Sequence, residues 1–182
     1  MSEIYQPAED SYLLLSVLEK IIPSILHKRK NLKFLEIGAG GGIHLEKALE
    51  LGIKKENILG TDINSEAVKY CRSLGFKCIK SNLFSYVKGK YDLIIFNPPY
   101  LPADEDGKEP KSSQVATTGG KQGGEIINKF LKQAGKHLSE NGKIILLISS
   151  LTRGIDFLRY NKIIVAEKKL FFEKLDVFEL SL

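Results

Sequence analysis

Four consecutive residues, Asn97-Pro98-Pro99-Tyr100, combine groups that could handle a planar NH₂ group. The Asn97 side-chain oxygen and the Pro98 carbonyl can each accept one N–H hydrogen bond. The two prolines stiffen the backbone and push the residues before them toward extended geometry, so the Pro98 carbonyl can point into a site. Tyr100 offers a flat face for stacking. Because the lone pair of a planar NH₂ nitrogen is delocalised, two such acceptors would favour the pyramidal form that attacks an electrophile.

A glycine-rich segment, Glu36-Ile37-Gly38-Ala39-Gly40-Gly41-Gly42, follows a short apolar run. Its glycines allow a tight turn and a close approach of the backbone to a ligand. The third glycine comes one residue too early for the dinucleotide pattern GxGxxG. An acid followed by GxGxG resembles motif I of the methyltransferases that use S-adenosylmethionine. That resemblance implies that Gly38 and Gly40 face the methionine half of the cofactor, and that Glu36 fixes the loop or binds the amino group.

Two further polar segments follow the next two apolar runs. Asp62 ends the second run, and its carboxylate could accept hydrogen bonds from both ribose hydroxyls. After the third run, the family resemblance assigns Asn82 and the backbone of Leu83 to the adenine ring. Asn82 stands where relatives usually have Asp, so we expect weaker binding. These residues could be mere turn residues, but three sites after three successive strands favour a ligand.

Short apolar strands alternate with helical stretches along the chain, which predicts an open, mostly parallel α/β sheet. The last two strands have little helix between them and predict an antiparallel pair at one sheet edge. The predicted strands are 32–37, 57–62, 76–80, 91–96, 143–149, 162–165 and 175–180, and the predicted helices are 8–22, 43–51, 65–74 and 124–138. This layout is the Rossmann-like class I methyltransferase fold, a seven-stranded sheet with an antiparallel C-terminal hairpin and helices on both faces.

Length and composition fit one domain over residues 1–182, with residues 1–30 as a helical extension packed on it. The apolar runs are too short to span a bilayer and no secretory signal is visible, which favours a cytoplasmic protein. The net charge of +5 comes from dispersed basic residues, with one dense run at 27–30 in a predicted loop. Cys71, Cys78 and the three scattered histidines form no cluster with metal-ligand spacing, so we predict no metal site.

The N-terminal segment from Tyr5 to Leu15, Tyr-Gln-Pro-Ala-Glu-Asp-Ser-Tyr-Leu-Leu-Leu, helps to discriminate among acceptors. It resembles the signature of the short eukaryotic and archaeal HemK-like glutamine methyltransferases, which modify the Gly-Gly-Gln tip of class I translation release factors. With the other motifs, the resemblance covers nearly the whole chain. It implies that Ser11 binds the cofactor, that Asn97 and Tyr100 bind the acceptor amide, and that the glycines of 119–124 contribute to the substrate site.

Members of this short branch commonly work with a small zinc-binding activator subunit, which pairs along an exposed edge strand. The corresponding edge in this sequence is Phe76 to Ile79. The resemblance therefore implies two protein partners, a release factor as substrate and an activator at that edge.

Three other functions compete with this interpretation. An enzyme acting on the exocyclic amine of adenine in RNA or DNA would suit the net charge and Tyr100, but no basic patch interleaved with aromatic residues is visible. A subunit that binds cofactor without catalysis is disfavoured by the intact Asn-Pro-Pro-Tyr. A dehydrogenase is disfavoured by the glycine spacing.

Overall fold

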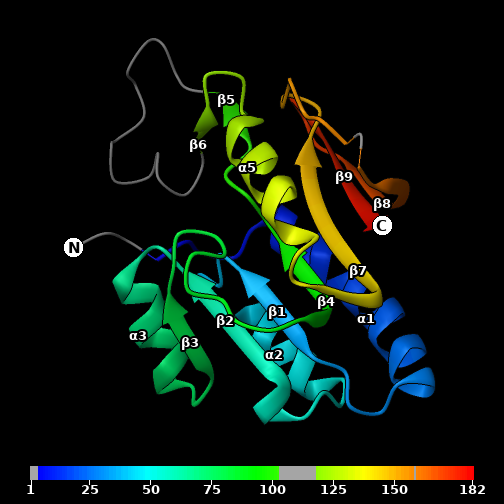
Figure 1. Cartoon of the computed structure of the whole chain (residues 1–182). Coiled ribbons are helices and arrows are strands. Elements are labelled where there is room, and N and C mark those ends of the chain that lie inside the picture. Colours follow the sequence, from blue (N-terminus) through cyan, green and yellow to red (C-terminus); the bar gives the residue numbers. More distant parts are fainter. Residues whose placement is uncertain (1–3, 103–117, 158) are drawn as a thin grey trace.

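The computed structural model describes residues 4–102, 118–157 and 159–182. Seven strands form one sheet in the order β3-β2-β1-β4-β7-β9-β8, and β5 and β6 form a separate parallel pair (Figure 1). The helices are α1 (Glu9–Lys28), α2 (Ile43–Glu50), α3 (Ser65–Ser73) and α5 (Glu125–Ala134), with a 3₁₀ turn at Lys55–Asn57. The strands are β1 (Phe34–Ile37), β2 (Ile58–Asp62), β3 (Lys77–Lys80), β4 (Tyr91–Phe96), β5 (Leu101–Pro102), β6 (Thr118–Gly120), β7 (Leu138–Ser149), β8 (Asn161–Lys169) and β9 (Lys174–Ser181).

Strands β1 to β4 and β7 run parallel, while β9 pairs antiparallel with both β7 and β8. This confirms the predicted fold class, including the C-terminal hairpin. The strand register determines where the site lies along the strands. Ile37 of β1 pairs with Thr61 of β2 and with Phe96 of β4. The residues that follow these three, Gly38, Asp62 and Asn97, therefore emerge together at the carboxyl edge of the sheet.

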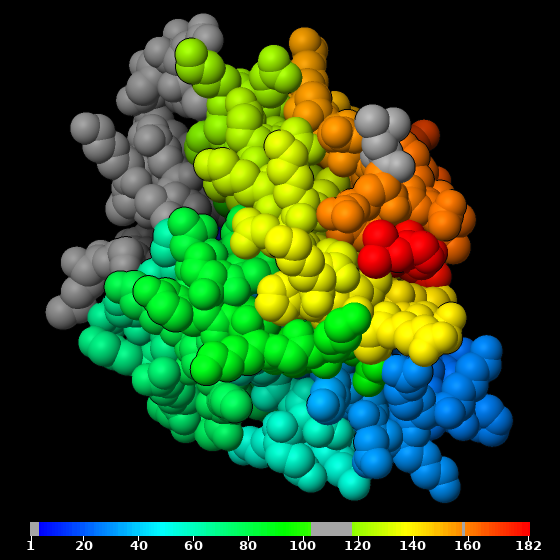
Figure 2. Space-filling model, viewed as in Figure 1, coloured from blue at the N-terminus to red at the C-terminus, as the bar shows by residue number. Residues whose placement is uncertain are grey.

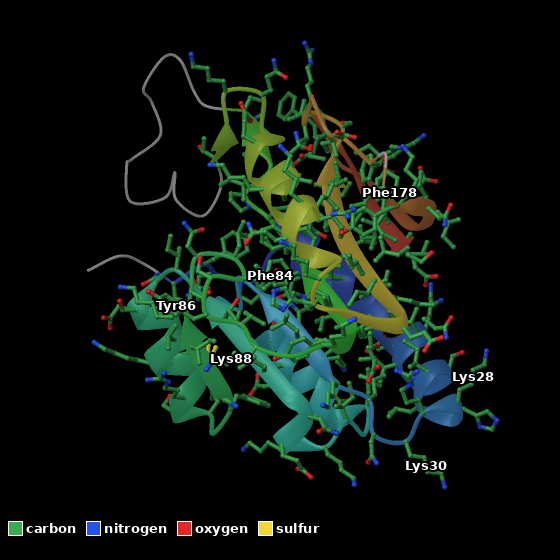
Figure 3. All side chains as sticks on the ribbon, viewed as in Figure 1. Lys28, Lys30, Phe84, Tyr86, Lys88 and Phe178 are labelled. Carbon is green, nitrogen blue, oxygen red and sulfur yellow. The ribbon has the colours of Figure 1, made fainter. Side chains whose placement is uncertain are left out.

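The central strands of the sheet are buried on both faces, and their alternate residues enter two different cores. Phe34 and Leu93 pack with the buried sides of α1, α2 and α3. Leu35 and Ile94 face the opposite way and pack with α5 and with Phe84 (Figure 3). In the space-filling view, α5 in yellow-green covers the front of the sheet (Figure 2). Burial on both faces explains the almost continuous apolar sequence of β4.

The first helix differs from the prediction, because it continues past residue 22 to Lys28 with Pro23 inside it. A proline within a helix normally breaks the hydrogen-bond ladder. Here Ile22, Ile25 and Leu26 extend the apolar side of α1 onto the core, so packing outweighs the local break. The start of the basic run predicted as a loop is thus helical, and Lys28 sits favourably at the negative end of the helix dipole (Figure 3).

Strand β7 begins at Leu138 rather than at 143, because Leu138 already pairs with Tyr91. Within this strand, Asn141 has a left-handed φ of 58°. Cys71 and Cys78 are free and buried, as expected of core thiols. In the described parts of the chain, no helix is both long and apolar enough to cross a bilayer.

Candidate active site

A cavity of about 640 Å³ opens at the carboxyl edge of the sheet, where the strand order reverses direction between β1 and β4. This is the usual ligand position in open α/β sheets. The glycines of 119–124 are not among its lining residues, but the residues predicted to bind the cofactor or the acceptor amide all line it: Ser11, Glu36, Gly38, Gly40, Asp62, Asn82, Leu83, Asn97, Pro98, Pro99 and Tyr100. The residues come from the first turn of α1 and from the ends of four strands.

The glycine loop after β1 forms the floor of one half of the cavity. Gly38 and Gly40 have φ values of 71° and 50°, in the left-handed region that side chains other than glycine rarely adopt. The Ala39 N–H donates to the Thr61 carbonyl at 2.8 Å, which ties the loop to β2. The loop is therefore shaped by backbone geometry and held by a neighbouring strand.

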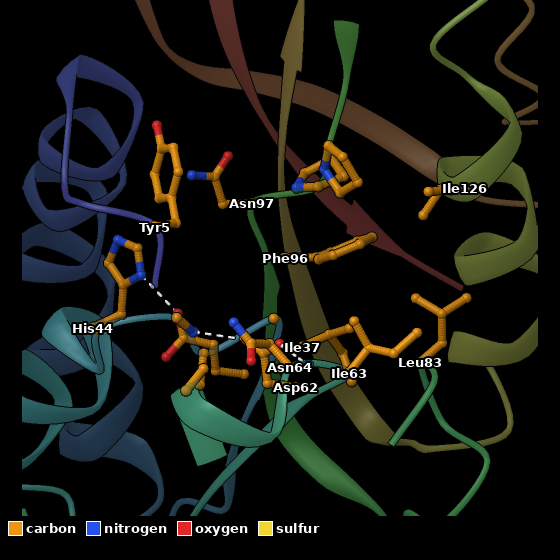
Figure 4. Close-up of a pocket in the computed structure, with 18 of the residues that line it drawn as sticks. Tyr5, Ile37, His44, Asp62, Ile63, Asn64, Leu83, Phe96, Asn97 and Ile126 are labelled. Carbon is orange, nitrogen blue, oxygen red and sulfur yellow. Dashed lines mark hydrogen bonds and ion pairs between the residues drawn. The ribbon is translucent and has the colours of Figure 1, made fainter. Parts of the chain in front are cut away.

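Asp62 organises the backbone next to this loop. One carboxylate oxygen accepts the Gly40 N–H at 2.9 Å and the other accepts the Asn64 N–H at 2.8 Å. Burial raises the pKa of Asp62, and these backbone hydrogen bonds oppose the rise. The carboxylate keeps acceptor capacity beyond these backbone donors, with which it could accept a ligand hydroxyl. Figure 4 shows Asp62 and Leu83 along one border of the cavity.

A buried pair that sequence reasoning missed lies under the glycine loop. His44 Nδ1 lies 2.7 Å from Glu36 Oε1, and its Nε2 lies 3.2 Å from the Ser11 carbonyl oxygen. Desolvation raises the pKa of Glu36, whereas the carboxylate partner raises the pKa of His44 against desolvation. The other Glu36 oxygen, Oε2, is buried and has no partner in the described structure. His44 was grouped with scattered histidines because its partner lies eight residues away on a different element.

The opposite half of the cavity holds the Asn-Pro-Pro-Tyr segment. The Asn97 Nδ2 donates to Asp10 Oδ2 at 2.9 Å, while its Oδ1 is buried without a partner in the described structure. The Tyr5 hydroxyl also contacts Asp10, at 2.8 Å, and lies beside Asn97 in Figure 4. Burial, followed by the charge of Asp10, raises the pKa values of Tyr5 and Tyr100, so both hydroxyls stay protonated. The sequence predicted no role in the site for Asp10 or Tyr5, which appear there only within the family signature.

The glycines of 119–124 include two that pack against the Asn-Pro-Pro-Tyr segment. A Cβ on Gly119 would overlap the Pro99 carbonyl oxygen, and one on Gly123 would overlap that of Tyr100. The Thr152 hydroxyl donates to the same Tyr100 carbonyl at 2.9 Å. The backbone of this segment therefore packs directly on the Asn-Pro-Pro-Tyr residues, while its role at the substrate site stays a prediction.

The cavity suits S-adenosylmethionine on two observations. The unpartnered Glu36 Oε2 offers a buried anionic acceptor for an ammonium group, and the volume accommodates a nucleoside joined to an amino acid. Among the described residues, no three His, Cys, Asp or Glu side chains gather as a metal site.

Comparisons with known proteins agree with this geometry. The model of the methyltransferase small domain matches residues 9–113, and that of the Eco57I restriction-modification methylase matches residues 73–171. A Methanocaldococcus jannaschii protein named as a candidate protein N5-glutamine methyltransferase is 40% identical over 156 residues, covering 82% of this chain and 74% of its own. A release factor glutamine methyltransferase of Lactococcus lactis is 30% identical, over 71% of this chain and 53% of its own.

A solved structure shares the fold over almost the full length. It is the E. cuniculi Mtq2–Trm112 complex, described as responsible for the methylation of the eRF1 translation termination factor. Its matched chain has a TM-score of 0.71 and 24% identity, and the match covers 99% of this chain and 98% of that one.

Proposed function

Since this chain belongs to the HemK-like methyltransferases that use S-adenosylmethionine, we propose that it methylates the side-chain amide of a glutamine. The acceptor is the glutamine of the Gly-Gly-Gln motif in a class I translation release factor. The observation that carries the proposal is the Asn97 Oδ1, a buried acceptor without a partner in the described structure, on a residue that lines the cavity. The names of the similar proteins support the choice of glutamine over other NH₂ groups.

Residues 1–182 act in this proposal as one catalytic domain with two groups of site residues. Ser11, Glu36, Gly38, Gly40, Asp62, Asn82 and Leu83 bind the cofactor, and Asn97, Pro98, Pro99 and Tyr100 bind and align the acceptor. Glu36 Oε2 meets the cofactor ammonium, and Asp62 accepts from the ribose hydroxyls. S-adenosylmethionine supplies a methyl group that its sulfonium has already activated.

Catalysis then consists of alignment and of localising one lone pair. Asn97 Oδ1 and the Pro98 carbonyl each accept one N–H bond of the glutamine amide, which turns the nitrogen lone pair toward the methyl carbon. The nitrogen–carbon bond forms as the sulfur–carbon bond breaks. The methylated nitrogen then loses one N–H proton to water. Until that step, the Asn97 Oδ1 and the Pro98 carbonyl oxygen accept hydrogen bonds from the amide N–H groups. Tyr100 packs against the planar amide.

The edge strand β3 is the proposed docking site of a small zinc-binding activator subunit. In the described part of the chain, β3 ends the sheet and has only β2 as a neighbour. Tyr70 on α3 and Tyr86 after β3 are exposed by 46% and 72%, and Figure 3 shows Tyr86 projecting near this edge. An unpaired strand flanked by aromatic side chains suits strand addition by a partner. An enzyme that modifies release factors would work in the cytoplasm, where translation ends.

The function is tested by transfer of a labelled methyl group from S-adenosylmethionine to candidate acceptors. These are a class I release factor, the same factor with Gly-Gly-Glu in place of Gly-Gly-Gln, transfer RNA, ribosomal RNA and duplex DNA, each with and without the activator. Label on the Gly-Gly-Gln protein alone, lost in the Gly-Gly-Glu control and in Asn97→Ala, is the expected result. An activator that changes neither solubility nor activity would refute the role of the β3 edge.

A second candidate function is methylation of the exocyclic amine of adenine in RNA or DNA. The match to the Eco57I restriction-modification methylase favours it, since that match includes residues 97–100. Label on nucleic acid alone, with binding that weakens steeply in salt, would establish this function instead.

A further inference from the structure

Asp10 forms hydrogen bonds with several residues of the acceptor half of the cavity, a role that no sequence motif indicated. Its carboxylate is 4% exposed and accepts the Ser11 N–H at 2.6 Å and the Tyr5 hydroxyl at 2.8 Å. It also accepts the Asn97 Nδ2 at 2.9 Å and, more weakly, the Tyr100 hydroxyl at 3.4 Å. The first turn of α1 is thereby joined to a segment 87 residues later.

The contact with Asn97 decides which way the carboxamide faces. An amide side chain has a donor end and an acceptor end, and its neighbours determine the orientation. A carboxylate only accepts, so Asp10 attracts the NH₂ end and repels the oxygen end. In the described structure the Asn97 Oδ1 is left buried and unpartnered, and Asn97 lines the cavity. The reverse orientation would turn the Asn97 NH₂ toward the substrate NH₂ group. Two groups that both donate hydrogen bonds cannot pair with each other.

We propose that Asp10 is a positioning residue that holds the Asn97 carboxamide in the one orientation able to accept a hydrogen bond from the substrate NH₂ group. The inference rests on the proposed function only in requiring an NH₂ acceptor, so it applies equally to glutamine and to adenine. Asp10 itself does not touch the substrate.

The neighbours of Asp10 hold its carboxylate in place for this task. The Tyr5 and Tyr100 hydroxyls remain protonated, since burial and Asp10 raise their pKa values, and both donate to the carboxylate. Together with the Ser11 N–H, these donors leave the carboxylate little freedom to rotate away from Asn97.

A purely structural role at the start of α1 is the competing account. Glu9 and Asp10 both lie in the first turn, where carboxylates stabilise a helix through its dipole. That role would lower the melting temperature when Asp10 is replaced, but it would not act through Asn97. The two accounts therefore differ in the coupling between the two residues.

The first experiment compares wild type, Asp10→Asn and the matched control Asp176→Asn, which alters a carboxylate on β9 outside the cavity. Single-turnover methyl transfer is measured on whichever acceptor the wild type modifies, together with the Kd for S-adenosylmethionine and Tm. Asp10→Asn replaces a carboxylate that only accepts hydrogen bonds with an amide that has one acceptor oxygen and one NH₂ donor. The Asn97 carboxamide is then no longer held in one orientation, so the transfer rate should fall about 10- to 100-fold. The Kd should change less than about 3-fold, as no cofactor contact is removed. A rate loss shared by the control, or explained by Kd alone, would overturn the inference.

The second experiment repeats Asp10→Asn in an Asn97→Ser background, where the carboxamide is absent. If Asp10 acts through Asn97, the substitution should have almost no further effect on the residual rate. An equal loss in both backgrounds would show that Asp10 acts independently.

A third measurement needs no variant of Asp10. The Asn97 side-chain NH₂, assigned by its disappearance from the NMR spectrum of Asn97→Ser, should exchange with solvent far more slowly than that of the exposed Asn31. Equal exchange rates would contradict a fixed orientation. If the wild type modifies nucleic acid rather than a release factor, the proposed function fails while all three measurements still decide the role of Asp10.

Discussion

The two halves of the cavity are built in different ways. Most of the cofactor half consists of loops that directly follow β1, β2 and β3, and a backbone N–H such as that of Gly40 ties them together by donating to the Asp62 carboxylate. The acceptor half depends on side chains from distant parts of the chain, since Asp10 and Tyr5 meet Asn97. Residues that form a site within one short loop appear as a motif in the sequence. Residues that meet only through long-range contacts appear as isolated positions without a recognisable pattern.

The largest expected effect comes from removing the acceptor group itself. Asn97→Ala deletes the oxygen that holds the substrate NH₂, so kcat should fall about 100- to 1000-fold, as when one transition-state hydrogen bond is lost. Affinity for S-adenosylmethionine, measured by calorimetry, should stay near the wild-type value, because the cofactor half is separate. A large loss of cofactor affinity would show that the two halves are not independent.

Asp62→Ala should produce the opposite pattern. It removes a group proposed to hold the ribose and also frees the Gly40 and Asn64 N–H groups. We expect the KM for S-adenosylmethionine to rise about 10- to 100-fold while kcat at saturation stays close to normal. The control is Glu66→Ala, which removes an exposed carboxylate of α3 that pairs with Lys69. If the control raises KM as much, the effect is one of general charge.

The buried His44–Glu36 pair makes the cofactor half sensitive to pH. Both pKa values are raised, so the folded pair retains a proton that the unfolded chain releases above about pH 6.5. Stability from His44 is thus fully present below about pH 6.5 and is lost as pH rises through the folded pKa. In wild type the free energy of unfolding should fall between about pH 6.5 and 8.5, by at most about 1.4 kcal/mol per pH unit.

Urea unfolding across this range checks the sign, with His44→Gln as the comparison. The variant lacks the titrating ring and should lose this part of the slope. The range stops at about pH 8.5, the ordinary pKa of a thiol, because Cys71 and the buried tyrosines, whose pKa values are also raised, add losses of their own above it. A slope that is unchanged in His44→Gln would assign the pH dependence to other groups.

The smallest expected effect concerns Asn82. Asn82→Asp restores the carboxylate usual in the family, and a charged acceptor binds an amine about twice as strongly as a neutral one. The Kd for S-adenosylmethionine should fall about 2- to 10-fold without a change in kcat. Asn141→Asp makes the same substitution at an exposed position outside the cavity and should leave the Kd unaltered.

The same contrast explains how much could be predicted from the sequence. Strand β4 was placed at its observed bounds because a parallel strand buried on both faces is apolar throughout. The end of α1 was missed because the packing of Ile25 and Leu26, not local propensity, carries the helix past Pro23. In the cavity, the roles of Asp10 and His44 depend on contacts that only the folded chain creates, so neither could be read from spacing.

The pairing of β5 with β6 fixes the backbone beside the Asn-Pro-Pro-Tyr segment. Leu101 pairs with Thr118 and Pro102 with Gly120, so two points of the chain are fixed next to each other beside Tyr100. A change in the number of residues between these two points would leave their spacing from β4 and from Gly123 as it is. The β5–β6 pair therefore ties the backbone next to Tyr100 to the segment whose glycines pack on Pro99 and Tyr100.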